Sequence, residues 1–210
     1  MKKKIHDAIY KHYTELFENH GEKPASLGWP KGRQDLRFKI ISEIGDVKNS
    51  KILDVGCGFG DFLTFLNTKK RKIEYTGIDI NPIFIKIAKS IHPNSSFQKR
   101  DIEIAKFNKK FDWSFAIGTT NMKGNYKYVE NLMIEMLRIS KKGIAMDFMS
   151  SYVDFKQKGS SHFAPERIFK IAKKLSKRVV IRHDYLPFEF CVYIYKNNKL
   201  TENQTFKDFN

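Results

Sequence analysis

The chain has 210 residues, of which 41% are hydrophobic and 14% aromatic. This length is enough for one α/β domain with a hydrophobic core, and the composition excludes an intrinsically disordered chain. Lysine and arginine number 39 against 23 aspartates and glutamates, which gives a net charge of +16 at pH 7. The positive charge raises nucleic acid, an anionic membrane surface or an acidic substrate as partners, without choosing among them.

Several missing features narrow the class of protein further. A run of about 18 apolar residues is absent, so we expect no membrane span. The basic start at 1–7 is not followed by an apolar segment, so we expect no signal peptide. The two cysteines, Cys57 and Cys191, form neither a disulfide framework nor a metal-ligand cluster. The sequence therefore predicts a soluble, cytoplasmic protein without a metal site.

The first 48 residues predict a helical segment ahead of the main domain. Apolar residues recur at helical spacing over 4–20, and Gly21 is a typical helix stop. A loop rich in proline and glycine is expected over 22–32, and a second helix over 33–44. We interpret the segment 1–48 as a lid on the domain that follows.

From residue 49 the pattern changes to alternating strands and helices, which is typical of a doubly wound, mostly parallel sheet. The expected strands are 51–55, 73–79, 96–101, 111–118, 143–149, 178–184 and 189–196. The expected helices are 61–68, 82–91, 126–140 and 165–175. The last two strands are joined by a turn too short for a parallel crossover, so the last strand is expected to run antiparallel. The sequence thus predicts a core domain over 49–196 and a frayed polar tail over 197–210.

The most informative segment begins at Asp54, at the end of a short apolar strand. Gly56, Gly58 and Gly60 alternate just before a predicted helix, and glycine lets a backbone turn sharply and approach a ligand closely. The spacing is neither the dinucleotide pattern G-x-G-x-x-G nor a phosphate-binding loop with Gly-Lys-Ser/Thr. A carboxylate at Asp54 would repel a pyrophosphate, whereas it suits a cation.

This segment resembles the first motif of the class I S-adenosylmethionine-dependent methyltransferases, an acidic residue followed by G-x-G-x-G. In that family an acid at the end of the second strand binds the ribose hydroxyls, and Asp79 stands at that place, with Ile80 against the adenine. Asp101 and Ile102 match the third motif, near the adenine amine, and a fourth motif runs over 111–118.

The resemblance covers about 50–196 and implies S-adenosylmethionine (SAM) as the cofactor. It also implies a Rossmann-like fold of seven strands with an antiparallel last strand. Cys57, flanked by glycines, is interpreted as a small packing residue of the loop rather than a nucleophile. The cofactor-binding residues that the resemblance implies are Asp54, Gly56, Cys57, Gly58, Gly60, Asp79, Ile80, Asp101, Ile102 and Gly118.

Methyl transfer is an in-line displacement that needs positioning, and a base where the acceptor must lose a proton. The long connection 150–164 favours a functional loop, and its His162 is our first candidate for a general base. His183, at the end of the sixth strand, and Tyr152 are the other catalytic candidates. The alternative for His162 is a solvated loop histidine, and for His183 a polar strand end.

The predicted lid supplies further candidates. Arg37 is predicted to meet the carboxylate of the cofactor or an anionic substrate, the alternative being a surface charge. Four more side chains are predicted to face the pocket: Tyr10, Tyr13, Trp29 and Gln34. For Tyr13 and Trp29 the alternative is the hydrophobic core.

Departures from the motifs of known subfamilies narrow the range of methyl acceptors to be expected. The segment 118–121 lacks the Asn/Asp-Pro-Pro-aromatic motif of nucleic-acid amino methyltransferases, and neither cysteine follows a proline as cytosine-C5 chemistry requires. We therefore expect methyl transfer to an O or N atom of a small molecule. A weaker resemblance to small methyltransferases of bacterial surface polysaccharide synthesis implies a sugar or a phosphorylated intermediate. An RNA methyltransferase, a non-catalytic cofactor-binding protein and, more distantly, a nicotinamide enzyme remain alternatives, and the oligomeric state is open.

The distribution of charge weakens the case for nucleic acid. The main basic groups directly precede strands, which places them at the amino edge of a parallel sheet: Lys51, 69–72, 109–110, 141–142 and 177–178. Acids gather instead at the opposite edge, where ligands bind in open α/β sheets: Asp54, Asp79, Asp101, Asp147 and Asp184. We expect the chemistry to take place on a locally acidic face.

Overall fold

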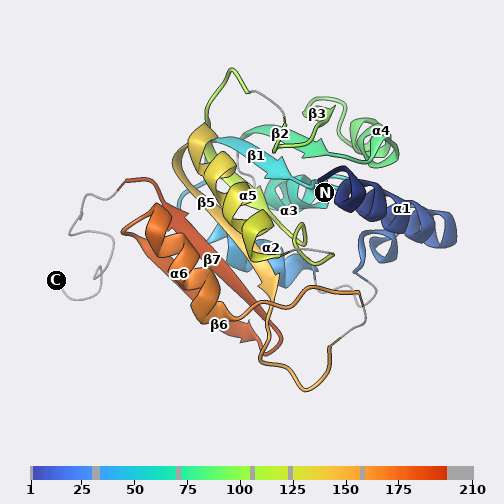
Figure 1. Ribbon diagram of the computed structural model, residues 1–210. Coiled ribbons are helices and arrows are strands. Elements are labelled where there is room, and N and C mark those ends of the chain that lie inside the picture. The colour runs from blue at the N-terminus through green and yellow to red at the C-terminus, as the bar shows by residue number, and fades with distance from the viewer. Residues whose placement is uncertain are drawn as a thin grey trace.

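The computed structural model describes residues 2–29, 34–69, 72–104, 107–122, 125–156 and 159–197, with side chains from residue 7 on. Within them, helices cover both faces of a seven-stranded sheet of order β3-β2-β1-β4-β5-β7-β6 (Figure 1). The strands are β1 (Lys51–Val55), β2 (Glu74–Asp79), β3 (Ser96–Lys99), β4 (Phe111–Ala116), β5 (Ser140–Met149), β6 (Val179–Leu186) and β7 (Glu189–Tyr195). The helices are α1 (Lys2–His20), the 3-10 helix η1 (Pro24–Leu27), α2 (Gln34–Ser42), α3 (Asp61–Thr68), α4 (Pro82–Ile91), α5 (Tyr126–Ile139) and α6 (Pro165–Leu175).

The predicted fold class is confirmed. Strands β1 to β5 pair in parallel, and β7 runs antiparallel to both β5 and β6. Several boundaries differ from the prediction by one to three residues, and two of them have a clear local cause. Strand β3 ends at Lys99, because the side chain of Asp101 accepts a hydrogen bond from Glu103 N (2.9 Å) and closes a turn. Strand β5 already begins at Ser140, because that residue ends α5 in an extended conformation.

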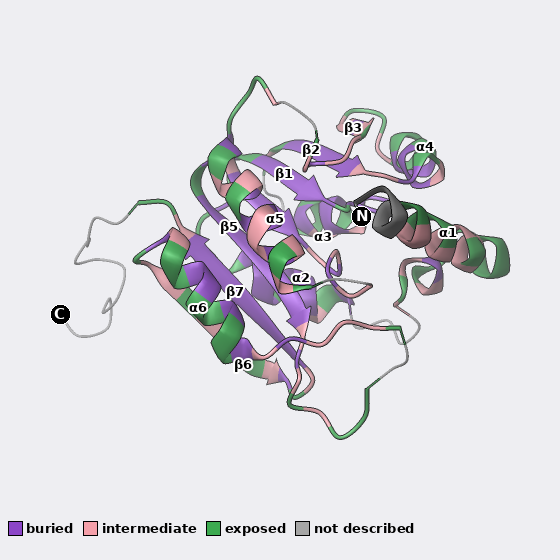
Figure 2. Ribbon diagram, in the orientation of Figure 1, coloured by how far each residue is buried: buried purple, intermediate pink, exposed green. Residues whose placement is uncertain are grey.

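The core lies on both faces of the sheet, and Figure 2 shows the central strands as almost wholly buried. Helices α5 and α6 cover one face with the apolar residues Leu132, Met136 and Ile168. Helices α2 and α3 cover the other face, where Phe38 and Phe62 pack together. Removing this apolar surface from water is the main driving force for the three-layer arrangement.

The first part of the segment before residue 49, α1 and η1, packs at the carboxyl edge of the sheet. Tyr13 and Phe17 of α1 make edge-to-face contacts with Phe84 at the start of α4, and Phe17 also meets Phe59 of the glycine loop. The buried Ser26 of η1 donates a hydrogen bond to Gly21 O (2.5 Å), which holds the turn between the two helices. This position matches the predicted lid, whose extent over 1–48 stays a prediction.

Two expectations concern other parts of the chain. The predicted tail over 197–210 lies outside the described residues apart from Asn197, as does the end of the loop 22–32. Among the described residues, no helix combines the length and the apolar composition that crossing a bilayer requires. The cytoplasmic location stays a prediction.

Candidate active site

A pocket opens at the carboxyl ends of β1, β2 and β4, beneath α1 and η1. About 1050 Å³ among its lining atoms is not occupied by protein, part of it open to solvent. Most residues predicted to bind a cofactor line it: Asp54, Gly56, Cys57, Gly58, Asp79, Ile80, Asp101, Ile102 and Gly118. The topology therefore brings together motifs that are far apart in the sequence.

The glycine loop forms one wall of this pocket. Gly56 and Gly58 both adopt positive φ angles, 74° and 53°, which favour glycine. Gly56 N donates to Ile78 O (2.8 Å), so the loop begins against the end of β2. A Cβ on Gly58 would stand 3.0 Å from the side chain of Leu27 in η1, so the missing side chain lets η1 lie against the loop. The loop thus presents bare backbone to the pocket.

Asp79 ends β2 and is held by backbone donors. Its Oδ1 accepts from Asn81 N (2.8 Å) and its Oδ2 accepts from Gly58 N (3.1 Å). These bonds lower the pKa of Asp79, but burial acts more strongly and raises it overall. Each carboxylate oxygen has a second lone pair, so both can still accept a hydrogen bond from a ligand hydroxyl.

Asn81 supplies an independent sign of a ligand. It is 2% exposed, lines the pocket, and caps α4 by accepting a hydrogen bond from Ile83 N (2.9 Å). Its buried Nδ2 has no hydrogen-bond partner within the described residues. Buried donors in native proteins are almost always paired, so this amide fits a pocket that a polar molecule completes.

Two more acids give the pocket its electrostatic character. Burial raises the pKa of Asp54 to about 7, although the hydroxyl of Tyr75 donates to its Oδ2 (2.5 Å) and opposes the shift. Asp61, at the start of α3, also has a raised pKa because of burial, and the Gln34 amide lies 3.4 Å from its Oδ2. A positively charged ligand would relieve the cost of burying these carboxylates.

The far wall of the pocket is formed at the end of β4. Gly118 N donates to Asp147 Oδ1 (2.6 Å), and Thr119 Oγ1 donates to Val55 O (2.8 Å). Asp147 is 5% exposed, and burial together with the nearby charge of Glu189 raises its pKa to about 7. Asp147 therefore fixes the backbone that borders the pocket without lining it.

The three predicted catalytic residues lie elsewhere in the described structure. His162 places Nδ1 2.8 Å from Ser150 O, and Tyr152 is exposed with its hydroxyl bonded to Glu166 (3.2 Å). The ring of His183 packs against Phe190, with centroids 5.8 Å apart. None of the three is among the pocket-lining residues, so their catalytic roles stay predictions.

The predicted lid residues divide into two groups. Tyr10, Tyr13, Trp29 and Gln34 line the pocket, as expected. Arg37 does not line it. Gly60 of the glycine loop, also predicted to bind the cofactor, does not line it either. The Arg37 guanidinium is buried in a two-fold hydrogen bond with Glu189 instead, so its assignment to the cofactor carboxylate stays a prediction that the pocket does not support.

Sequence reasoning missed several lining residues. Asn81 precedes Pro82 at the start of α4, a typical helix-capping signal that was available. Asp61 directly follows the glycine motif. Tyr128 of α5 and Arg100 after β3 carry no local signal, because only the packing of α5 and of the β3 end brings them to the pocket.

The family follows from comparison with known proteins. A family model described as "Methyltransferase domain" matches residues 46–199, most of the chain. The chain belongs to the class I SAM-dependent methyltransferases. SAM is accordingly the cofactor of this methyltransferase, and the acidic pocket with a free buried amide fits it.

Among its relatives is the putative methyltransferase Rv1506c of Mycobacterium tuberculosis, 29% identical over 154 residues. That match covers 69% of this chain and 92% of the relative. The phthiotriol/phenolphthiotriol dimycocerosates methyltransferase of Mycobacterium leprae is 29% identical over 101 residues, 47% of this chain but 36% of that protein. Magnesium protoporphyrin IX methyltransferase (ChlM) from Synechocystis PCC 6803, crystallised with bound SAH, superposes with a TM-score of 0.68. Its identity is 11%, with coverage of 94% of this chain and 100% of that one, so it shows the shared fold.

Proposed function

We propose that this methyltransferase methylates an O or N atom of a small molecule, and that a sugar of surface polysaccharide synthesis is the best-fitting acceptor class. The observation that carries the proposal is the cover over the pocket: Tyr10, Tyr13 and Trp29 of the lid segment line it from above. Aromatic faces of this kind pack well against the apolar face of a sugar ring. Gln34 and Thr119 also line the pocket and supply polar groups for hydroxyls.

The charge of the pocket favours a sugar over a phosphorylated intermediate. Among the described residues, Asp54, Asp61, Asp79 and Asp101 line it against one lining cation, Arg100, and Arg37 of the lid segment is already paired with Glu189. A phosphate group would add negative charge beside these carboxylates, at a cost that low dielectric increases. The acceptor is therefore expected to be uncharged where it meets the pocket.

Roles in cofactor binding follow from the same geometry. Asp79 is proposed to accept hydrogen bonds from the ribose hydroxyls, and Asn81 Nδ2 to donate to the cofactor. Ile80 and Ile102 are proposed to flank the adenine, and Asp54 to balance positive charge. SAM, when bound, supplies a methyl group activated by its sulfonium.

His162 remains the proposed general base. Its Nδ1 lies at hydrogen-bond distance from a carbonyl, which accepts only, so in the neutral ring Nδ1 carries the proton. Nε2 then holds the lone pair, and it is buried without a hydrogen-bond partner within the described residues. His162→Ala is expected to lower turnover about a hundredfold while SAH affinity, measured by calorimetry, stays within about twofold.

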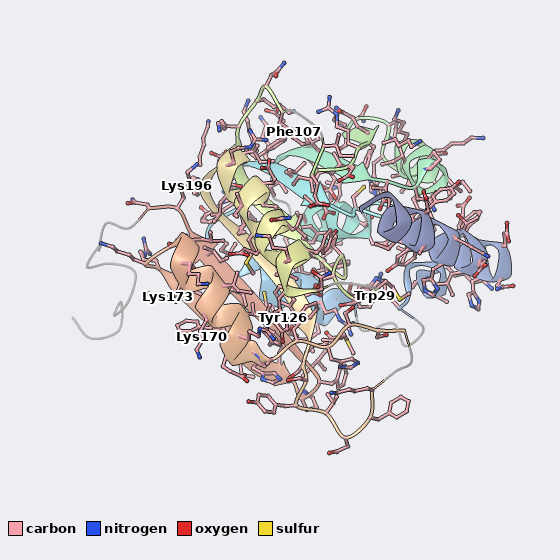
Figure 3. All side chains as sticks on the ribbon, viewed as in Figure 1. Trp29, Phe107, Tyr126, Lys170, Lys173 and Lys196 are labelled. Atoms are coloured by element: carbon pink, nitrogen blue, oxygen red, sulfur yellow. The ribbon has the colours of Figure 1, made fainter. Side chains whose placement is uncertain are left out.

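The RNA alternative rests on the net charge of +16. Figure 3 shows Lys170, Lys173 and Lys196 on the side of the molecule opposite Trp29. An RNA held by those cations would not present its bases to the pocket. The position of the charge thus favours the small acceptor.

The proposal is tested with SAM carrying a radiolabelled methyl group and three acceptor pools: neutral mono- and oligosaccharides, sugar phosphates, and total RNA. Label is expected in the neutral saccharide pool. Label confined to RNA would overturn the proposed acceptor, and label confined to sugar phosphates would overturn the charge argument. The variant Asp79→Ala serves as the control, because it should lose labelling in every pool.

A further inference from the structure

Trp29 lies directly against the end of β4. A Cβ on Gly118 would stand 2.6 Å from the Trp29 ring, so only a glycine allows this approach. Gly118 also has a positive φ of 70°. Both residues line the pocket, and Trp29 is labelled in Figure 3. The indole is thus a wall of the pocket, contributed by the lid segment.

Arg37 supports this indole. Its guanidinium carbon lies 4.3 Å from the centroid of the Trp29 ring, a cation–π contact. Arg37 is itself held by Glu189, the first residue of β7, through Nε to Oε2 and through the terminal nitrogen to Oε1. The two residues are 7% and 2% exposed. A buried, two-fold bond of this kind fixes the plane of the guanidinium.

Asp147 lies beside this group of contacts. The charge of Glu189 acts on the Asp147 carboxyl, and Asp147 accepts the Gly118 N–H (2.6 Å). Gly118 is in turn covered by Trp29. We call these five residues the lid latch: Trp29, Arg37, Glu189, Asp147 and Gly118. Two come from the segment before residue 49 and three from the core domain.

We propose that Arg37 and Glu189 are positioning residues that hold Trp29 over Gly118 as a wall of the methyl-transfer pocket. Arg37 does this through its guanidinium, which lies over the indole ring, while Gly118 borders the ring at Cζ2 and Cη2. This role differs from binding the cofactor carboxylate, because Arg37 does not line the pocket. The latch couples the lid to β5 and β7 at the point where an acceptor meets the pocket.

Tryptophan fluorescence tests the proposal without knowledge of the acceptor. The chain has two tryptophans, and Trp113→Phe leaves Trp29 as the single reporter. Trp113 does not line this pocket, and its indole donates to Asp46 O (3.2 Å) near the amino edge. Titration with SAH should change the Trp29 emission and lower its acrylamide quenching at least twofold.

Breaking the latch should release Trp29. In the Trp113→Phe background, Arg37→Ala is expected to raise acrylamide quenching of Trp29 at least twofold and to shift its emission to the red. Arg37→Ala leaves Glu189 buried without its partner. A second variant, Arg37→Met with Glu189→Met, therefore removes both charges together. If circular dichroism shows that either variant fails to fold, the isosteric Glu189→Gln carries the same comparison.

Arg182→Ala is the matched control. It breaks an arginine–carboxylate pair to Glu43 (2.8 Å), just after α2, without contact to Trp29, and should leave the quenching unchanged. The proposal is overturned if Trp29 quenching and its response to SAH are the same in the latch variants as in the parent. It is also overturned if SAH affinity falls more than about a hundredfold while Trp29 quenching is unchanged, because Arg37 would then bind the cofactor directly.

Discussion

The carboxyl edge and the amino edge of the sheet hold their acidic residues in different ways. At the carboxyl edge, Asp54, Asp79 and Asp147 are bonded by a tyrosine hydroxyl or by backbone N–H groups, and burial raises the pKa of each. At the amino edge, Glu74 is exposed and pairs with Lys51 (3.0 Å) and Lys109 (3.5 Å), which lower its pKa. Uncharged partners thus hold these acids at the carboxyl edge, so within the described residues no lysine or arginine ion pair neutralises them as at Glu74, and their negative charge can attract a cationic cofactor.

The lysines of the amino edge have structural partners of their own. Lys110 Nζ donates to Arg138 O (2.5 Å), and Lys196 Nζ donates to Leu137 O (3.0 Å) and Ser140 O (2.9 Å). Cations at the end of a helix bind its last carbonyls and complement its dipole. Part of the large positive charge therefore stabilises helix ends rather than marking a nucleic-acid site.

The largest expected effect is a difference in SAH affinity between substitutions at the two ends of β2. Asp79→Ala removes an acceptor from the backbone of the glycine loop and from the ribose, and bonds to a charged group are worth about 1.5 to 3 kcal/mol each. We expect SAH affinity to fall at least about a hundredfold in calorimetry. Glu74→Ala, at the other end of the strand, should leave the affinity within about twofold. Equal affinities in the two variants would refute the assignment of Asp79.

The dependence of folding stability on pH should also separate the buried acids from the exposed ones. An aspartate whose pKa is raised on folding keeps its proton more readily in the folded state, so the stability it contributes is lost as the pH rises. For Asp54 and Asp147 the loss spans about pH 4, the unfolded pKa, to about pH 7. We expect a decrease on the order of a few kcal/mol in urea unfolding of the protein without cofactor.

Asp147→Asn should make that pH profile flatter. The pKa of the exposed Asp184 is lowered by its partner Arg182, so this residue acts in the opposite sense: its contribution is present above about pH 4 and lost as the pH falls. Asp184→Asn should therefore leave the loss between pH 4 and 7 in place. A profile that stays level or rises over this range in the unmodified protein would contradict the raised pKa values.

A smaller effect concerns the charge of the cofactor. As the pH rises from 6 to 8, Asp54 loses its proton, and its negative charge then favours the sulfonium of SAM over the neutral sulfur of SAH. The affinity for SAM should increase up to about tenfold relative to that for SAH, and Asp54→Asn should remove the difference. Parallel pH dependence of the two affinities would show that Asp54 does not sense the cofactor's charge.

The smallest effect is expected at the amino edge. Lys141 and Lys142 border a second hollow beside Trp113, remote from the cofactor pocket. The double change Lys141→Ala with Lys142→Ala should alter SAH affinity and methyl transfer less than twofold. A large loss of methyl transfer at unchanged SAH affinity would revive an acceptor, such as RNA, that is held by this edge.

The sequence predicts the sheet and the cofactor end of the site better than the acceptor end. Strand β1 and helices α3, α4 and α6 have the predicted bounds, because local patterns and helix-start prolines define them. The acids at strand ends meet because parallel strands place their carboxyl ends together. Arg37, however, pairs with a residue 152 positions away, and no local pattern reports which charge a lid residue meets once it is packed.

A crystal structure of the protein with SAH tests the central claim most directly. We expect the ribose hydroxyls at Asp79, the adenine between Ile80 and Ile102, and the sulfur facing the space beside Trp29 and Gly118. A ligand bound at the amino edge, or at the carboxyl edge without contact to Asp79, would contradict the account.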